Sequence, residues 1–226
     1  VQGMAAEGNR YTGFLYAGLM IMPDGTPKVI EYNCRFGDPE TQPIMMRLKS
    51  DLVALCTAAL DKTLHHCTVD WDRRAALGVV LAAGGYPNDY RKGDIISGLP
   101  ASSTEDSKVF HAGTREVDGQ VVTNGGRVLC AVGLGNTVFQ AQQRAYQLAA
   151  QICWNDVYFR HDIGYRAIAR EQALLLLLTL QPDLKALSIQ FKIHFKILLN
   201  QHHIGIRSMS LYSCQRESCY PFVNRA

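Results

Sequence analysis

An apolar strand pattern that runs straight into a dense polar stretch is the strongest constraint on the fold of this chain. Residues 28–33 read KVIEYN, and CRFGDPETQ follows at once as residues 34–42. Side chains alternate across a strand, so Glu31 and Asn33 point to one face, with Cα atoms roughly 6.5 to 7 Å apart. From Pro43 onward, apolar residues recur near helical spacing. The sequence therefore predicts a strand, a sharp polar junction and a helix over residues 43–62.

Glu31 and Asn33 together offer a ligand pair for a hard cation. Magnesium prefers oxygen ligands and commonly takes one or two protein groups together with substrate phosphates. A solvated strand face is the ordinary interpretation of a Glu-x-Asn pair taken alone. The residues that follow this pair favour a phosphate–metal site instead.

The junction after the strand contains residues with special chemistry. Arg35 offers a two-pronged guanidinium for a phosphate or a carboxylate, and Gly37 permits a sharp turn or the close approach of a ligand. Asp38 precedes Pro39, which predicts that Asp38 is the N-cap of the next helix. Glu40 then falls in the first helical turn, where the helix dipole favours a negative charge. Asp38 and Glu40 are therefore explained either as helix-start residues or as part of a site.

The remaining patterns predict an α+β protein with mostly antiparallel strands. A strand over residues 11–22, followed by the turn sequence PDGTP, pairs with residues 28–33 as a hairpin. We expect the helix over residues 43–62 to pack behind this hairpin. A closing helix over residues 135–152 has Thr137 or Asn136 as its N-cap. The other predicted strands cover residues 75–83, 94–97, 109–112, 116–123 and 127–133.

Composition restricts the class of protein. The chain has 226 residues and 47% hydrophobic content, which is ample for a packed core. Its net charge of +3 does not call for nucleic acid or an anionic membrane as a partner. The longest purely apolar run, at residues 173–178, is far shorter than the roughly 20 residues of a membrane span. Seven cysteines without a CxxC pair argue against a disulfide framework or a zinc knuckle and predict a cytoplasmic protein.

Residues 172–226 differ in texture from the rest of the chain. From Gln172 onward there are six Lys or Arg and only two Asp or Glu, so the positive charge belongs to this segment. We expect an atypical tail that is disordered or foreign to the preceding domains. A basic arm that binds nucleic acid is the weaker alternative.

The polar junction also carries a resemblance to a known family. EYNCRFGDPETQ at residues 31–42 resembles the E-x-N-x-R-F-G-D-P-E-T-Q signature of phosphoribosylamine–glycine ligase (glycinamide ribonucleotide synthetase), an ATP-grasp family of purine biosynthesis. The segments GMAAEGNRYTGFLYAGLM before it, and LGVVLAAGGYP, KVFHAGT and VVTNGGRVLCAVGLG after it, resemble the same family in order. The resemblance covers residues 1–171. It implies the C-terminal end of an ATP-grasp domain over residues 1–54 and a small mixed, mostly antiparallel C-terminal domain over residues 55–171.

The resemblance also implies a reaction and a set of roles. In this family, ATP as co-substrate phosphorylates glycine, and the amine of 5-phosphoribosylamine attacks the acyl phosphate to give glycinamide ribonucleotide. Glu31 and Asn33 fall on the family's ligand positions for Mg²⁺ or Mn²⁺. The other implied site residues are Arg35 and Asp38 as catalytic groups, and Arg35, Asp38, Glu40 and Arg127 as substrate-binding groups.

Three further expectations come from the family segments that this sequence lacks. The family's N-terminal domain, and the lysines and glycine-rich loop that hold the ATP phosphates, are not found in this sequence. We therefore expect the isolated chain to be inactive, a separate N-terminal half to be its partner, and the hairpin over residues 11–33 to expose apolar surface. Two functions remain as alternatives to this ligase. One is another ATP-grasp carboxylate–amine ligase, which would not need the RFGDPETQ loop, and the other is a non-catalytic module that complements a separate N-terminal half.

Overall fold

The computed structural model describes residues 1–176. The chain divides into two compact units, Val1–Tyr165 and Arg166–Ala226. The first unit is built from antiparallel sheets and helices, which confirms the α+β prediction. In the second unit residues 166–176 are helical, and the expectation for the tail lies, from residue 177 onward, outside the described residues. Among the helices of residues 1–176, none has the length and apolar character to cross a membrane.

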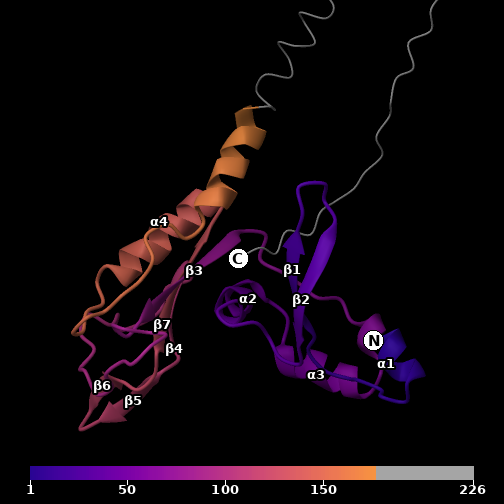
Figure 1. Cartoon of the computed structure of the whole chain (residues 1–226), viewed down its shortest axis with the longest axis horizontal. Coiled ribbons are helices and arrows are strands. Elements are labelled where there is room, and N and C mark those ends of the chain that lie inside the picture. The colour runs from indigo at the N-terminus through magenta and orange to yellow at the C-terminus, as the bar shows by residue number, and fades with distance from the viewer. Residues whose placement is uncertain (177–226) are drawn as a thin grey trace, which may run out of the picture. The chain divides into compact units, whose positions relative to one another are not determined.

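The predicted hairpin is present. After the short helix α1 (Gln2–Ala6), strands β1 (Tyr16–Ile21) and β2 (Pro27–Asn33) pair antiparallel (Figure 1). Strand β1 begins at Tyr16 instead of residue 11, and it places Tyr16 opposite Asn33. The register slips by one residue between Gly18 and Leu19, and such a bulge bends a strand and sharpens its twist.

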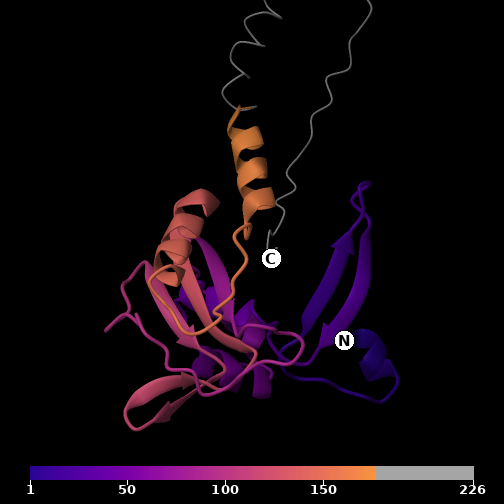
Figure 2. The ribbon, with the colours of Figure 1, turned by 60° about the vertical axis from the view of Figure 1, so that its left-hand side comes forward.

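The main sheet has the strand order β3-β7-β4, all antiparallel. Its strands are β3 (Ala75–Ala82), β7 (Arg127–Gly135) and β4 (Ser107–His111). Helix α4 (Val138–Ala149) lies along one face of this sheet (Figure 2). The predicted cap is confirmed, because Thr137 Oγ1 accepts a hydrogen bond from the backbone N–H of Gln140 at 3.1 Å. The core contains side chains with almost no exposure to solvent, among them Val79, Leu81, Val128, Leu129, Ala141 and Ala145.

Small residues allow helix α4 to approach the sheet closely. Ala141 and Ala145 are wholly buried on the helix, and they face Gly133 of β7. A Cβ atom on Gly133 would lie only 2.8 Å from the backbone nitrogen of Ala145. Helix packing therefore requires a glycine at position 133.

The single helix predicted for residues 43–62 is wrong. The structure has two helices, α2 (Thr41–Arg47) and α3 (Leu52–Leu60), and a short 3₁₀ turn η1 (Leu64–His66) follows. Leu48 is extended and forms an isolated bridge with Trp71. Asp51 then caps α3, because its Oδ1 accepts from the backbone N–H of Val53 at 2.8 Å. Apolar spacing alone did not reveal that Asp51 starts a new helix.

Helix α2 packs against β3 and β7 instead of behind the hairpin. Pro43 lies so close to β3 that a Cβ atom on Gly78 would be 3.2 Å from its Cγ. The polar junction is therefore attached directly to the main sheet.

Two predicted strands are also corrected. Residues 116–123 do not form one strand, but belong to a hairpin of β5 (Thr114–Val117) and β6 (Gln120–Thr123). Asp118 and Gly119 both have positive φ, at 50° and 76°, which is the Asp-Gly signature of a tight hairpin turn. Residues 94–97 form only isolated bridges, from Ile95 to Val122 and from Ser97 to Cys153.

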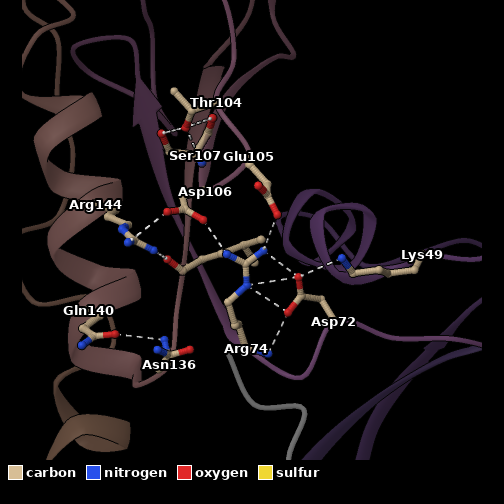
Figure 3. A network of polar contacts seen from close by, with 11 residues as sticks. Lys49, Asp72, Arg74, Thr104, Glu105, Asp106, Ser107, Asn136, Gln140 and Arg144 are labelled. Carbon is tan, nitrogen blue, oxygen red and sulfur yellow. Dashed lines mark hydrogen bonds and ion pairs between the residues drawn. The ribbon is translucent and has the colours of Figure 1, made fainter.

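A network of charged groups joins the start of β3 to its surroundings (Figure 3). Arg74 Nη2 lies 2.7 Å from Asp72 Oδ2, and Arg74 Nε donates to both carboxylate oxygens at 3.0 and 3.1 Å. Asp72 is only 7% exposed. These hydrogen bonds hold the pKa of Asp72 well below its ordinary value.

The same network reaches three other segments. Lys49, in the link between α2 and α3, lies 3.5 Å from Asp72 Oδ2. Arg74 also pairs with Asp106 ahead of β4, and Arg144 of α4 lies 3.0 Å from the other oxygen of Asp106. Because segments far apart in the sequence meet here, the network holds the link between α2 and α3 against the main sheet.

Candidate functional site

The polar junction lies between the end of β2 at Asn33 and the start of α2 at Thr41. Asp38 is not the N-cap that the sequence predicts, because the helix begins later and Glu40 occupies the cap position without a side-chain cap bond. The Oγ1 hydroxyl of Thr41 instead donates to the carbonyl of Gly37 at 2.6 Å. The side chain of Asp38 is thereby left for a contact outside the helix.

Tyr16 is the centre around which several junction residues converge. Its hydroxyl donates to Glu40 Oε1 at 3.3 Å. Burial raises the pKa of Tyr16, the negative charges of Glu40 and Glu31 raise it further, and the positive charge of Arg35 opposes them. Two carboxylates and one guanidinium are therefore close enough to act on the same phenol.

Two glycines make room for these groups. Gly37 is buried, and a Cβ atom there would lie 2.7 Å from the ring of Tyr16. A Cβ atom on Gly18 would lie 3.2 Å from Cγ of Glu31 on the opposite strand. The site thus depends on the absence of side chains at Gly18 and Gly37.

The side chains of Glu31 and Asn33 fit a hard cation. Glu31 is exposed and has no ion-pair partner among the described residues. The Nδ2 atom of Asn33 is buried and has no hydrogen-bond partner there either, so no hydrogen bond through Nδ2 fixes the orientation of the amide, whose oxygen is a candidate ligand. Residues 1–176 contain no group of three or more His, Cys, Asp or Glu that would form a complete metal site. A cation held by this pair would take its other ligands from water and from substrate phosphates, as Mg²⁺ commonly does.

Arg35 lies on the exposed side of the junction. Its Nη1 donates to the carbonyl of the neighbouring Phe36 at 2.8 Å, and the Phe36 ring packs on Phe14 with centroids 4.2 Å apart. Most of the donors of the Arg35 guanidinium are thus left for an anionic group.

Asp38 and Arg127 are brought together although they lie 89 residues apart in the sequence. Arg127 Nη1 donates to the Asp38 carbonyl at 2.9 Å and lies 3.2 Å from Asp38 Oδ2. Arg127 Nε donates to the hydroxyl of Tyr86 at 3.1 Å. The pKa of Arg127 is raised above its ordinary value, mainly by the hydrogen bond to Tyr86 and also by the charge of Asp38.

Sequence reasoning missed two residues at this site. Tyr16 lies within the strand predicted over residues 11–22, and Tyr86 lies within the segment LGVVLAAGGYP, where no local pattern marks either tyrosine as a site residue. Gly84 and Pro87 lie close to Tyr86 in the sequence and indicate a turn. They do not indicate where the Tyr86 side chain points. Only the pairing of the strands brings either tyrosine to the junction.

Comparison with known proteins gives the family. The family model described as phosphoribosylglycinamide synthetase, ATP-grasp (A) domain, matches residues 1–41, and the model for the C domain of the same synthetase matches residues 76–166. The phosphoribosylamine–glycine ligase of Vibrio vulnificus (strain CMCP6) is 71% identical over 172 residues, which is 76% of this chain and 40% of that protein. The chain belongs to the phosphoribosylamine–glycine ligase family. The ligase of Escherichia coli (strain K12) is 66% identical over 173 residues, again 76% of this chain and 40% of the relative.

A solved structure of the phosphoribosylamine–glycine ligase family is also similar to this chain. The crystal structure of the Thermotoga maritima ligase superposes with a TM-score of 0.61 at 39% identity, covering 71% of this chain and 39% of that one. The chain therefore spans about two fifths of the length of the ligases that it matches. The match to the ATP-grasp model contains Glu31, Asn33, Arg35, Asp38 and Glu40, whereas Arg127 lies in the match to the C domain.

Proposed function

We propose that this chain supplies the metal pair and the substrate loop of an ATP-dependent ligase that joins glycine to 5-phosphoribosylamine. The observation that carries the proposal is an exposed carboxylate and an uncommitted amide, Glu31 and Asn33, within the part of the chain that matches the ATP-grasp domain. The proposed boundaries are residues 1–54 for the end of that domain, 55–171 for the C-terminal domain and 172–226 for the tail.

The reaction that this function requires has two steps. The γ-phosphoryl group of ATP passes to a carboxylate oxygen of glycine, which leaves ADP and forms glycyl phosphate. The amine nitrogen of 5-phosphoribosylamine then attacks the carbonyl carbon, phosphate leaves, and the nitrogen loses a proton. The products are glycinamide ribonucleotide, ADP and phosphate.

Each junction residue has a proposed role in these steps. Glu31 and Asn33 would hold Mg²⁺ or Mn²⁺, which when bound neutralises charge on the transferring phosphoryl group. Arg35 compensates the same charge with its free donors. Asp38 accepts the proton from the attacking nitrogen, and Glu40 and Arg127 border the amine substrates with it. Arg127 keeps its Nη2 group for a substrate, since its partners among the described residues bind to Nε and Nη1.

The openness of the junction supports a second, complementary polypeptide. Glu31, Arg35 and Asp38 are all exposed, yet phosphoryl transfer to a carboxylate competes with transfer to water unless the site is enclosed. We infer that an N-terminal half, corresponding to the part of the ligases that this chain does not match, closes the site and holds ATP.

The five described cysteines are free thiols, in line with our proposal of a cytoplasmic location.

Complementation tests this function directly. The purified chain alone should release no ADP with Mg²⁺, ATP, glycine and 5-phosphoribosylamine. Addition of a separately produced N-terminal half of the ligase should restore release that depends on both amine substrates. Turnover by the chain alone, free of host enzyme, would contradict the need for a partner, and an inactive mixture of associated halves would contradict the ligase function.

A non-catalytic module is the second candidate, and the exposed apolar hairpin favours it. Met20, Ile30 and Tyr32 are 55%, 64% and 61% exposed, and Leu19, Met22 and Val29 are also exposed. The exposure of so many large apolar side chains on one hairpin indicates an interaction site. A module of this type would associate with the N-terminal half without restoring turnover.

The exposed hairpin leads to a prediction about dye binding. We expect the isolated chain to enhance the fluorescence of a hydrophobic dye, and the Ile30→Lys variant to reduce this signal because it places a charge at the middle of the surface. Val117→Lys in the β5–β6 hairpin is the matched control, since Val117 is 38% exposed on a separate sheet. A monodisperse chain without dye enhancement would show that this surface is covered.

A further inference from the structure

The geometry points to Tyr86 as a positioning residue that sets the direction of Arg127 and, through Arg127, holds the loop that carries Asp38. The contact between Tyr86 and Arg127 can be tested without any enzymatic activity, and only its consequence for substrates rests on the proposed function. Tyr86 lies between β3 and β4 in the part of the chain that matches the C domain. It therefore acts on the ATP-grasp junction from the other family domain.

Tyr86 holds the guanidinium of Arg127 by two kinds of contact. Its hydroxyl accepts the hydrogen bond from Arg127 Nε at 3.1 Å. The guanidinium carbon also lies 5.9 Å from the centroid of the Tyr86 ring, within the range of a cation–π interaction. The hydrogen bond fixes where the Arg127 fork points, because Nε is the inner nitrogen of the planar group.

The ring of Tyr86 is itself fixed by its surroundings. It occupies the space that a Cβ atom on Gly126 would fill, so the residue before Arg127 must be glycine for this packing. Tyr90 packs edge-to-face on Tyr86 with centroids 6.0 Å apart. The backbone N–H of Tyr86 donates to the carbonyl of Ala83 at 3.1 Å. A rigid phenol is therefore presented to Arg127.

Arg127 passes this constraint on to the junction loop. Its Nη1 group contacts both the carbonyl and the carboxylate of Asp38, at 2.9 and 3.2 Å. The side chains of Arg127 and Asp38 are 40% and 59% exposed, and exposed ion pairs stabilise a fold very little. The effect of the arrangement is thus to orient Asp38, which lies 89 residues away in the sequence.

A Tyr86→Phe variant tests the arrangement, because it removes the hydroxyl and keeps the ring against Gly126. In ¹H–¹⁵N spectra of the chain, the Arg127 Nε–H signal is assigned by its loss in Arg127→Lys. We expect its exchange with water to accelerate about fivefold in Tyr86→Phe, as loss of one hydrogen bond of ordinary strength implies. Tyr90→Phe is the matched control, since it removes a hydroxyl from the adjacent ring and should leave the signal unchanged.

The loop itself provides a second measurement. We expect trypsin to cleave after Arg35 several times faster in Tyr86→Phe than in the unaltered chain, because the loop around Asp38 is less well held. Cleavage after Arg115, in the separate β5–β6 hairpin, should keep its rate. Equal behaviour of Tyr86→Phe and Tyr90→Phe in both measurements would overturn the inference.

The consequence for substrates is measured in the complemented enzyme. There Tyr86→Phe should raise the KM for glycine or 5-phosphoribosylamine several-fold and leave the KM for ATP within twofold, whereas a merely structural loss would lower the amount of active enzyme and leave each KM unchanged. If complementation yields no turnover, the proposed function fails, and the exchange and cleavage rates still decide the role of Tyr86.

Discussion

Replacing Glu31 with glutamine is expected to lower ADP release by the complemented enzyme about 10²- to 10³-fold, the size of effect seen when one electrostatic contact to a transition state is removed. Glutamine keeps the shape of the side chain but removes the charge that attracts a divalent cation. Both protein ligands of the cation would then be neutral amides. The measurement is the initial rate of ADP release as a function of Mg²⁺ concentration.

The matched control for Glu31→Gln is Glu7→Gln. Glu7 is an exposed residue at the end of α1 and has no ion-pair partner among the described residues, so its replacement should leave the rate within twofold. Association of the two halves should be unaffected in both variants. If Glu31→Gln retains full activity at low Mg²⁺ concentration, the strand-borne metal pair is assigned to the wrong residues.

Replacing Asp72 with asparagine is expected to lower the free energy of unfolding by about 3 kcal/mol, the lower end of the effect of breaking a buried ion pair. Asp72 is 7% exposed and receives hydrogen bonds from both the backbone and the guanidinium of Arg74. Arg74 keeps Asp106 as a partner, which is why we expect the lower end. Urea unfolding of the chain at pH 7, followed by circular dichroism, measures the loss.

Glu105→Gln is the control within the same network. Glu105 lies 3.9 Å from Arg74 but its side chain is 87% exposed, so its removal should change the free energy of unfolding by no more than about 0.5 kcal/mol. Similar losses for Asp72→Asn and Glu105→Gln would mean that burial of Asp72 is not what gives the network its strength.

The low pKa of Asp72 also predicts how this difference depends on pH. Arg74 holds the pKa of Asp72 below its ordinary value in the folded chain, whereas the unfolded chain regains a value of about 3.9. The unfolded state therefore binds the proton first as the pH falls, and the stabilisation is complete above about pH 5 and disappears at lower pH. The difference between the unaltered chain and Asp72→Asn should narrow steadily from pH 5 to pH 2, and a constant difference would contradict this origin.

Much of the fold could be predicted because it depends on local patterns. The alternation in β2, the apolar run of β3 and the Thr137 cap of α4 are all properties of short segments, and the structure confirms them. The turn at Asp118 and Gly119 is present in the sequence as a known hairpin signal, but the strand predicted over residues 116–123 runs through it. The helix break at Asp51 was missed for a similar reason, since a capping residue inside an apolar pattern is easily taken for a surface position.

The candidate site, like the fold, could be predicted only in part from the sequence. Sequence spacing alone placed Glu31 and Asn33 on one face of a strand, and the long RFGDPETQ motif indicated the family, which the comparisons then established. The direction of Asp38 was not determined locally. As an N-cap it would have faced the helix, whereas the structure turns it toward Arg127.

The sequence by itself therefore determined most of the elements, the strand that carries Glu31 and Asn33, and the family, because each of these is encoded by neighbours within a few residues of one another. Only the tertiary structure decided that Arg127 contacts both Tyr86 and Asp38, that Tyr16 donates to Glu40, and that Asp72 and Arg74 join four segments. The physical reason is that these contacts depend on strand pairing and helix packing between distant segments, and neither composition nor periodicity contains the distances that such pairing creates.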